Sequence, residues 1–139
     1  MTFSPENPLP IVMADDDPDD RMMAREAFEE CVSVECVGFV EDGEALLVLL
    51  RSLTILPRLI LLDWNMPRKN GREALIELKA DRALANIPVV VLTTSTDPMD
   101  IEQASVLGAA GFMIKPITFE GLVAFAHEMI HRYAPEAVA

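Results

Sequence analysis

The polar side chains most able to do chemistry each follow a short apolar run. They are the acidic pair Asp15 and Asp16, followed along the chain by Asp63, Thr93 and Lys115. Short apolar runs separated by helix-length segments predict buried strands of a parallel sheet. In such sheets functional groups gather at the carboxyl ends of the strands. Three carboxylates, a hydroxyl and an ammonium at one sheet edge would suit a divalent cation and a phosphoryl group.

The segments that must position these side chains alternate between strand and helix five times. Strands are predicted over 9–14, 34–40, 58–63, 87–93 and 111–115. Helices are predicted to follow them, over about 17–31, 42–53, 71–84, 97–108 and 118–133. Asp17, Asp42 and Thr118 are predicted N-caps, and Gly108 is of the type that ends a helix.

Five strand–helix units predict a doubly wound α/β sandwich with a flavodoxin-like five-stranded parallel sheet. Right-handed crossovers favour the strand order 2-1-3-4-5, which places the ends of the first and third strands side by side. Asp15, Asp16 and Asp63 are therefore expected to converge, with Thr93 and Lys115 completing the ring.

Length and composition predict one domain. Residues 1–8 are expected to be a flexible lead-in, 9–133 the domain, and 134–139 a short tail with no output domain. The net charge of −12 argues against binding nucleic acid or an anionic membrane, because both attract basic surfaces. The chain shows neither a signal peptide nor an apolar run long enough to span a bilayer, which predicts a cytoplasmic protein. Cys31 and Cys36 lack metal-site spacing and a neighbouring His, so two free thiols are expected.

The carboxylates have a specific chemical use if they converge. A cluster of unpartnered carboxylates repels itself, and a bound Mg²⁺ would relieve that repulsion. A carboxylate such as Asp63 can also act as a nucleophile toward phosphorus and form an aspartyl phosphate. Lys115 would neutralise the charge of the phosphoryl group, and Thr93 would donate a hydrogen bond to it.

Several motifs together carry a family resemblance. They are D-D-D-P at 15–18, L-D-W-N-M-P at 62–67, Gly71, T-T-S at 93–95 and K-P at 115–116. With these motifs, residues 9–132 resemble a response-regulator receiver domain of two-component signalling. Residues 67–73 and 92–95 are also similar to stand-alone regulators that work with bacterial and cyanobacterial phytochrome kinases.

The resemblance implies how the carboxylates work. Asp63 would accept a phosphoryl group from the phosphohistidine of a kinase. Asp16 and Asp63 would bind Mg²⁺ together with the backbone carbonyl of Asn65, and Asp15 would act mostly through a bound water.

The resemblance also implies a switch. Lys115 would pair with phosphoryl oxygens, Thr93 would move toward them, and Phe112 would rotate into the vacated space. Phe112 stands where the family often has tyrosine and lacks its hydroxyl, so an ordinary core role is the alternative. The Lys115–Pro116 peptide is commonly cis in this family.

The function implied is that of a single-domain response regulator rather than a stand-alone enzyme, although it would catalyse its own phosphorylation and dephosphorylation. Its expected partners are a sensor histidine kinase, in particular a phytochrome-type one, and a downstream protein or histidine phosphotransfer protein. Related regulators also form homodimers through the fourth helix, fifth strand and fifth helix. The alternative is a receiver-like interaction module that acts independently of phosphorylation.

Two enzyme readings are weaker. His127 to His131 match H-E-x-x-H, the zinc-protease motif, but both histidines are predicted on the solvent side of their helix. An Asp-nucleophile phosphohydrolase typically needs a second carboxylate two residues after the nucleophile. This chain has Asn65 there, which cannot act as the acid–base.

Overall fold

A computed structural model describes residues 4–94 and 97–133 of the 139-residue chain. Strands and helices alternate as predicted. In chain order they are β1 (Leu9–Ala14), α1 (Pro18–Glu29), β2 (Val34–Val40), α2 (Gly43–Ser52), β3 (Leu59–Asp63), α3 (Gly71–Ala80), β4 (Val89–Thr93), α4 (Pro98–Val106), β5 (Gly111–Ile114) and α5 (Phe119–Tyr133).

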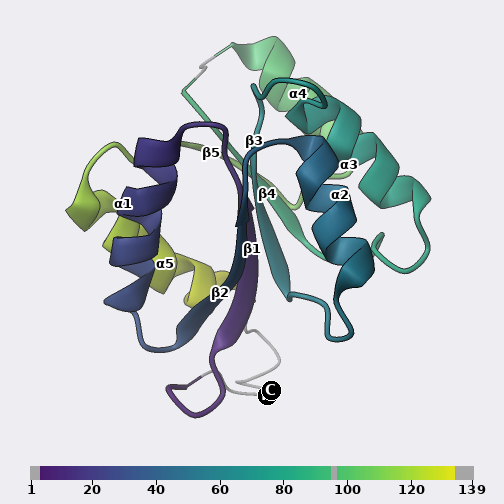
Figure 1. Ribbon diagram of the computed structural model, residues 1–139. Helices are drawn as coiled ribbons and strands as arrows, with labels where there is room; N and C mark the ends of the chain where they lie inside the picture. The colour runs from purple at the N-terminus through teal and green to yellow at the C-terminus, as the bar shows by residue number, and fades with distance from the viewer. Residues whose placement is uncertain (1–3, 95–96, 134–139) are drawn as a thin grey trace.

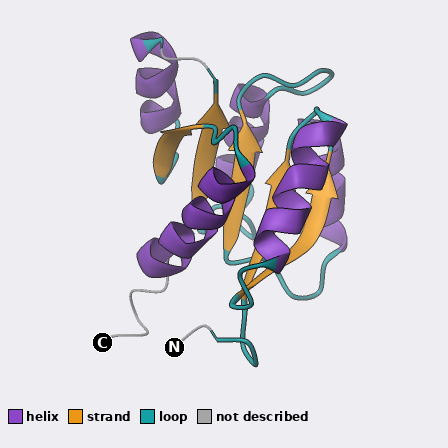
Figure 2. Cartoon of the chain, turned by 90° about the vertical axis from the view of Figure 1, so that its left-hand side faces the viewer, coloured by secondary structure: helices purple, strands orange, loops and turns teal. Residues whose placement is uncertain are grey.

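The strands form one parallel sheet in the order β2-β1-β3-β4-β5, which confirms the predicted topology. Helices α1 and α5 cover one face of the sheet, and α2, α3 and α4 cover the other (Figure 1). The turned view in Figure 2 shows the strands lying between these helices. β1 pairs directly with β3, with Ala14 opposite Leu62, so the segments that follow these two residues leave the sheet at the same edge.

Apolar side chains fill both spaces between sheet and helices. The central strands β3 and β4 are buried along their whole length, as continuous apolar runs predict. The core beneath α1 and α5 includes Ala24, Ala27, Phe28, Leu122, Phe125 and Met129. The core beneath α2 and α3 includes Leu46, Leu47, Leu50, Ala74, Leu75 and Leu78. Burial on both faces fixes the register of β1, β3 and β4, and therefore the place where each strand ends.

Helix α3 is shorter than predicted, ending at Ala80 rather than near residue 84. The side chain of Asp81 accepts a hydrogen bond from the N–H of Ala83 at 2.9 Å. The N–H of Leu84 donates to the carbonyl of Asp81 at 3.0 Å. An aspartate that bonds to the backbone two residues ahead forms a turn and competes with helix continuation.

The expected cis peptide is not observed. The described residues contain no cis peptide bond, so Lys115–Pro116 is trans. The trans form is the more stable one even before proline, by roughly 0.5–1 kcal/mol.

Near the start of the chain, Ser4 and Asn7 exchange two backbone hydrogen bonds of 3.0 Å and close a tight turn. The predicted tail 134–139, residues 1–3 of the lead-in, and Ser95 of the T-T-S motif lie outside the described residues. Within the described ranges, no helix has the length and apolar character needed to cross a membrane.

Candidate functional site

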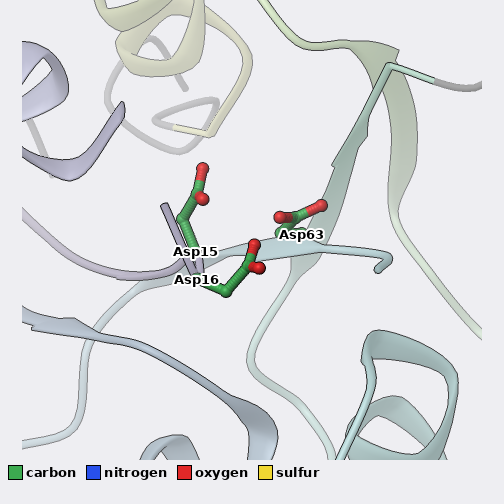
Figure 3. Close-up of side chains that lie close together, drawn as sticks. All are labelled: Asp15, Asp16 and Asp63. Atoms are coloured by element: carbon green, nitrogen blue, oxygen red, sulfur yellow. The ribbon is translucent and has the colours of Figure 1, made fainter. Parts of the chain in front are cut away.

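Three carboxylates meet at the carboxyl edge of the sheet. Ligand oxygens of Asp15, Asp16 and Asp63 all lie within 4.8 Å of one another. Figure 3 shows the carboxylate of Asp16 directed toward that of Asp63, with Asp15 beside them. Asp15 and Asp63 are buried, with 0% and 6% of their surface exposed, whereas Asp16 is open to solvent. The adjacency of β1 and β3 brings these side chains together, as strand order predicts.

Backbone contacts on both sides hold Asp15 in place. Its N–H donates to the carbonyl of Val40 at 2.9 Å, which continues the pairing of β1 with β2. Its Oδ1 accepts the N–H of Asp17 at 2.9 Å, and its carbonyl accepts Nη1 of Arg21 at 2.7 Å. Asp17 in turn caps α1, as predicted, through a 2.9 Å bond from the N–H of Asp19.

One ammonium serves several of these carboxylates. The N–H of Lys115 donates to the carbonyl of Thr93 at 2.8 Å, which extends the pairing of β4 with β5. Its Nζ lies 2.8 Å from Oδ2 of Asp15, 3.2 Å from Oδ2 of Asp20 and 3.5 Å from Oδ2 of Asp63. Lys115 therefore balances part of the negative charge at the edge of the sheet.

The environment shifts the pKa values of Asp15, Asp63 and Lys115. Burial raises the pKa of Asp63 to about 6, with the charge of Asp15 adding to the rise and Lys115 opposing it. Burial likewise raises the pKa of Asp15, against the opposing effect of Lys115. For Lys115, burial lowers the pKa, but the close contact with Asp15 and the charge of Asp63 outweigh burial and raise it overall.

The donor set fits a hard divalent cation. Oδ2 of Asp15 is buried, and its charged partner is the ammonium of Lys115, 2.8 Å away. Asp16 offers an exposed carboxylate through which a cation could enter. Mg²⁺ favours carboxylate oxygens supplemented by waters, so it would relieve the mutual repulsion of three carboxylates whose charge Lys115 balances only in part.

The segment after Asp63 turns sharply beneath the site. The N–H of Asn65 donates to Oδ1 of Asp63 at 3.3 Å, and the N–H of Gly71 donates to the carbonyl of Trp64 at 3.1 Å. A Cβ at Gly71 would lie 2.5 Å from the carbonyl oxygen of Asp63 and 2.8 Å from Cα of Trp64. A glycine at position 71 is therefore required by this close approach of backbone to backbone.

A set of contacts that the sequence did not predict ties this segment to the start of α2. Arg68 has a left-handed backbone, with φ of 60°, and its guanidinium pairs with the buried carboxylate of Asp42 and with Glu41. The N–H of Gly43 donates to the carbonyl of Lys69 at 2.8 Å. We call these three contacts the loop–α2 clamp. It fixes the backbone that includes Asn65.

The two predicted switch residues occupy different environments. Thr93 is fully buried at the end of β4. Phe112 pairs with Val91 across β4 and β5 and is half-buried against the core beneath α2 and α3, to which Ala104 of α4 also belongs. A partly buried ring at this point borders both core and solvent.

The two histidines are exposed on α5, as predicted. Nδ1 of His127 lies 3.7 Å from Sγ of Cys31. The two residues are 96 positions apart in the sequence, and their contact corrects the expectation that Cys31 has no neighbouring histidine. Across residues 4–94 and 97–133, the only cluster of three or more candidate metal ligands is that of Asp15, Asp16 and Asp63. His127 and His131 therefore do not belong to a three-ligand zinc site of the kind a metalloprotease needs.

Comparisons with known proteins agree with this arrangement. The family profile of the response regulator receiver domain matches residues 11–127. The chain is similar to the probable methanogenesis regulatory protein FilR2 of Methanothrix harundinacea, with 36% identity over 121 residues, covering 84% of this chain and 78% of FilR2. It is also similar to the response regulator Rcp1 of Synechocystis sp., with 35% identity over 99 residues, covering 68% of this chain and 67% of Rcp1.

The solved structures that resemble this chain are also response regulators. The phosphorylated cyanobacterial phytochrome response regulator RcpA matches with a TM-score of 0.80 and 32% identity, over 91% of this chain and 94% of RcpA. The Mn²⁺-bound form of Rcp1 matches with a TM-score of 0.72 and 29% identity, over 88% of this chain and 91% of that one. The family profile spans most of the chain. The fold of the chain, its strand order and its acidic sheet edge agree with this family match. The chain belongs to the response regulator receiver domain family.

Proposed function

We propose that this protein signals by accepting a phosphoryl group on Asp63 from the phosphohistidine of a sensor histidine kinase. The observation that carries the proposal is the position of Asp63, a buried carboxylate within 4.8 Å of two others and 3.5 Å from the Lys115 ammonium. A nucleophile is useful toward phosphorus only if the charge of the phosphoryl group is neutralised, and Lys115 together with a cation held by the three carboxylates would provide that neutralisation.

In the proposed transfer, the phosphoryl group moves from a histidine nitrogen of the kinase to the carboxylate of Asp63. A carboxylate oxygen of Asp63 attacks phosphorus, and an O–P bond forms as the P–N bond to the kinase imidazole breaks. The electron pair of the broken bond stays on the imidazole nitrogen, which takes a proton from solvent. Lys115 lies near enough to pair with the phosphoryl oxygens, and Thr93 supplies a hydroxyl at the end of the adjacent strand.

The cofactor we propose is Mg²⁺. Asp16 and Asp63 would bind it directly, the backbone carbonyl of Asn65 would add a further ligand, and Asp15 would act mostly through water. Bound there, the ion would neutralise charge on the phosphoryl oxygens. The Mn²⁺-bound form of Rcp1 supports a divalent cation in a related protein, and the cluster of three carboxylates supports one here.

The signal would be a change in surface. Phosphorylation adds charge and three acceptor oxygens, which would draw Thr93 inward and let the Phe112 ring follow. Phe112 lies on β5 beside α4, where large apolar side chains are already exposed. They are Met99, Ile101, Val106, Ile114 and Ile117. If Phe112→Ala leaves both partner affinity and its dependence on phosphorylation unchanged, Phe112 is a core residue and not a switch.

The partners we propose follow from the relatives. RcpA is described as a phytochrome response regulator, which supports a phytochrome-type kinase as the phosphoryl donor. A downstream protein or a histidine phosphotransfer protein would read the phosphorylated form, and a second copy could dock through α4, β5 and α5. The acidic surface disfavours nucleic acid and anionic membranes. We place this activity in the cytoplasm, and we assign the protein no turnover beyond its own phosphorylation and dephosphorylation.

The alternative is a module whose contacts ignore phosphorylation. The exposed apolar side chains of α4 and β5 favour it, because they are available to a partner without any phosphoryl group. Equal partner affinity for the wild-type protein and Asp63→Asn would support this module.

The deciding experiment is the intact mass of the protein after incubation with acetyl phosphate. We expect a gain of one phosphoryl group that requires Mg²⁺ and is lost in Asp63→Asn. Asp17→Asn is a matched control, because Asp17 is a nearby exposed aspartate whose capping role asparagine preserves. A gain that persists in Asp63→Asn would overturn the assignment of Asp63.

A further inference from the structure

Lys115 has a carboxylate partner that takes no part in the proposed phosphoryl site. Oδ2 of Asp20, in the first turn of α1, lies 3.2 Å from Nζ of Lys115, which is closer than Oδ2 of Asp63 at 3.5 Å. Asp20 is outside the group of Asp15, Asp16 and Asp63 whose oxygens could share a cation. Lys115 is therefore divided between the sheet-edge carboxylates of Asp15 and Asp63 and an acidic side chain from another element.

We propose that Asp20 is a positioning residue that competes with the phosphoryl group for Lys115 and so slows phosphorylation of Asp63. The inference rests on the proposed function, because it assigns Lys115 the role of pairing with phosphoryl oxygens. It makes the first turn of α1 a determinant of how readily the acceptor is modified.

The competition follows from how the charges are distributed. A divalent cation bound by Asp15, Asp16 and Asp63 would neutralise those carboxylates and weaken their hold on Lys115. Asp20 would keep its full charge, because it belongs to α1 rather than to the sheet edge. Its side chain is 38% exposed, so its attraction for Lys115 is screened by solvent and modest, but it persists in every state of the site.

The turn that carries Asp20 is anchored, and the ammonium of Lys115 has free space beside it. Asp17 caps α1 and accepts the N–H of Asp20 at 3.4 Å, which anchors the turn. A cavity of about 190 Å³ lies beside Lys115 and includes Asp20 and Met23 in its lining. The long lysine stem therefore has room to move its ammonium between Asp20 and the acceptor.

The test compares Asp20→Asn with Asp19→Asn. Asp19 is the adjacent exposed aspartate in the same turn, so both variants change the net charge equally. The probe is acetyl phosphate with Mg²⁺, and the readout is the initial rate of phosphoryl gain by intact mass. We expect Asp20→Asn to react about three- to five-fold faster than Asp19→Asn, as suits loss of a partly exposed ion pair.

A Lys115→Gln background separates competition from a structural effect. Without the ammonium there is nothing to compete for, so Asp20→Asn should then change the rate no more than Asp19→Asn does. Urea unfolding of each variant checks that the fold is intact.

Three results would overturn the proposal. They are equal rates for the two single variants, a slower rate for Asp20→Asn, and an acceleration that survives in Lys115→Gln. With any of these three results, Mg²⁺-dependent phosphorylation of the wild-type protein would still support the proposed function. No modification of any variant would overturn the proposed function and this inference together.

Discussion

Nζ of Lys115 lies 2.8 Å from Oδ2 of Asp15, whose side chain is fully buried, and 3.5 Å from Oδ2 of Asp63, which is nearly so. The side chain of Lys115 is itself only 11% exposed. Two buried carboxylates therefore depend on one largely buried ammonium for charge balance. Breaking a buried ion pair from one side leaves an uncompensated charge, and this costs more than the pair contributes as a whole.

Replacing Lys115 should destabilise the fold when no divalent cation is present. We expect Lys115→Gln to lower the free energy of unfolding at neutral pH by about 3 kcal/mol. Lys69→Gln is the matched control, because Lys69 pairs with the more exposed carboxylates Glu44 and Glu77 and should lose less than about 1 kcal/mol. Urea titrations with a chelator measure both, and equal losses would contradict this account of Lys115.

Stability without metal should fall as the pH rises through the titration of Asp63. The folded protein holds this proton up to a pKa of about 6, whereas the unfolded chain releases it at the ordinary, lower pKa. Between these values the folded state binds more protons, so the free energy of unfolding decreases as pH increases.

Asp63→Asn removes this dependence, because asparagine does not titrate. We expect the variant to exceed the wild-type protein by about 1–3 kcal/mol at about pH 8, with the difference shrinking toward about pH 4. Urea unfolding at several pH values, followed by Trp64 fluorescence, measures the slope. A difference that grows on acidification would show that burial does not raise the pKa of Asp63.

Magnesium should stabilise the folded protein, because only the folded chain brings the three carboxylates together. At a concentration one hundred times its dissociation constant, the gain would be about 2.7 kcal/mol. Asp16→Asn should remove most of this gain while changing the metal-free stability little, since Asp16 is exposed. Asp17→Asn should keep it. Thermal unfolding with and without Mg²⁺ measures the stabilisation of each variant. If Mg²⁺ stabilises Asp16→Asn as much as the wild-type protein, Asp16 is not a ligand.

Gly71→Ala should disturb the backbone of the acceptor itself. The added Cβ would lie 2.5 Å from the carbonyl oxygen of Asp63, a rigid backbone atom that cannot move aside cheaply. We expect a loss of about 1–3 kcal/mol and a reduced phosphorylation rate. Gly111→Ala is the control, because its Cβ would meet no atom closer than 3.5 Å. Normal stability of Gly71→Ala would mean that the segment after Asp63 relaxes freely.

Much of this architecture could be predicted because short apolar runs alternate along the chain with helix-length segments. The ends of β1 and β2 coincide with the predicted ranges, and the strand order followed from the handedness of crossovers. The convergence of Asp15 and Asp63 needed only that order, since neighbouring parallel strands end at the same edge.

Contacts between distant segments could not be predicted. Nothing in the sequence around Asp20 indicates that Lys115, 95 residues away, is its partner. The left-handed backbone of Arg68 and its pairing with Asp42 depend on how two loops pack, and a sequence pattern contains no such distance. Cys31 and His127 come together only because α1 packs against α5.

Locating the phosphoryl group on the chain tests the central claim most directly. An aspartyl phosphate is an acyl phosphate, which borohydride reduces so that the modified aspartate becomes homoserine. The protein would be treated with Mg²⁺ and acetyl phosphate, reduced and digested, and its peptides sequenced by mass spectrometry. We predict homoserine at position 63 and unmodified aspartate at Asp15, Asp16 and Asp20. Homoserine at one of those aspartates instead, or a phosphoryl group retained on another residue type, would contradict Asp63 as the acceptor.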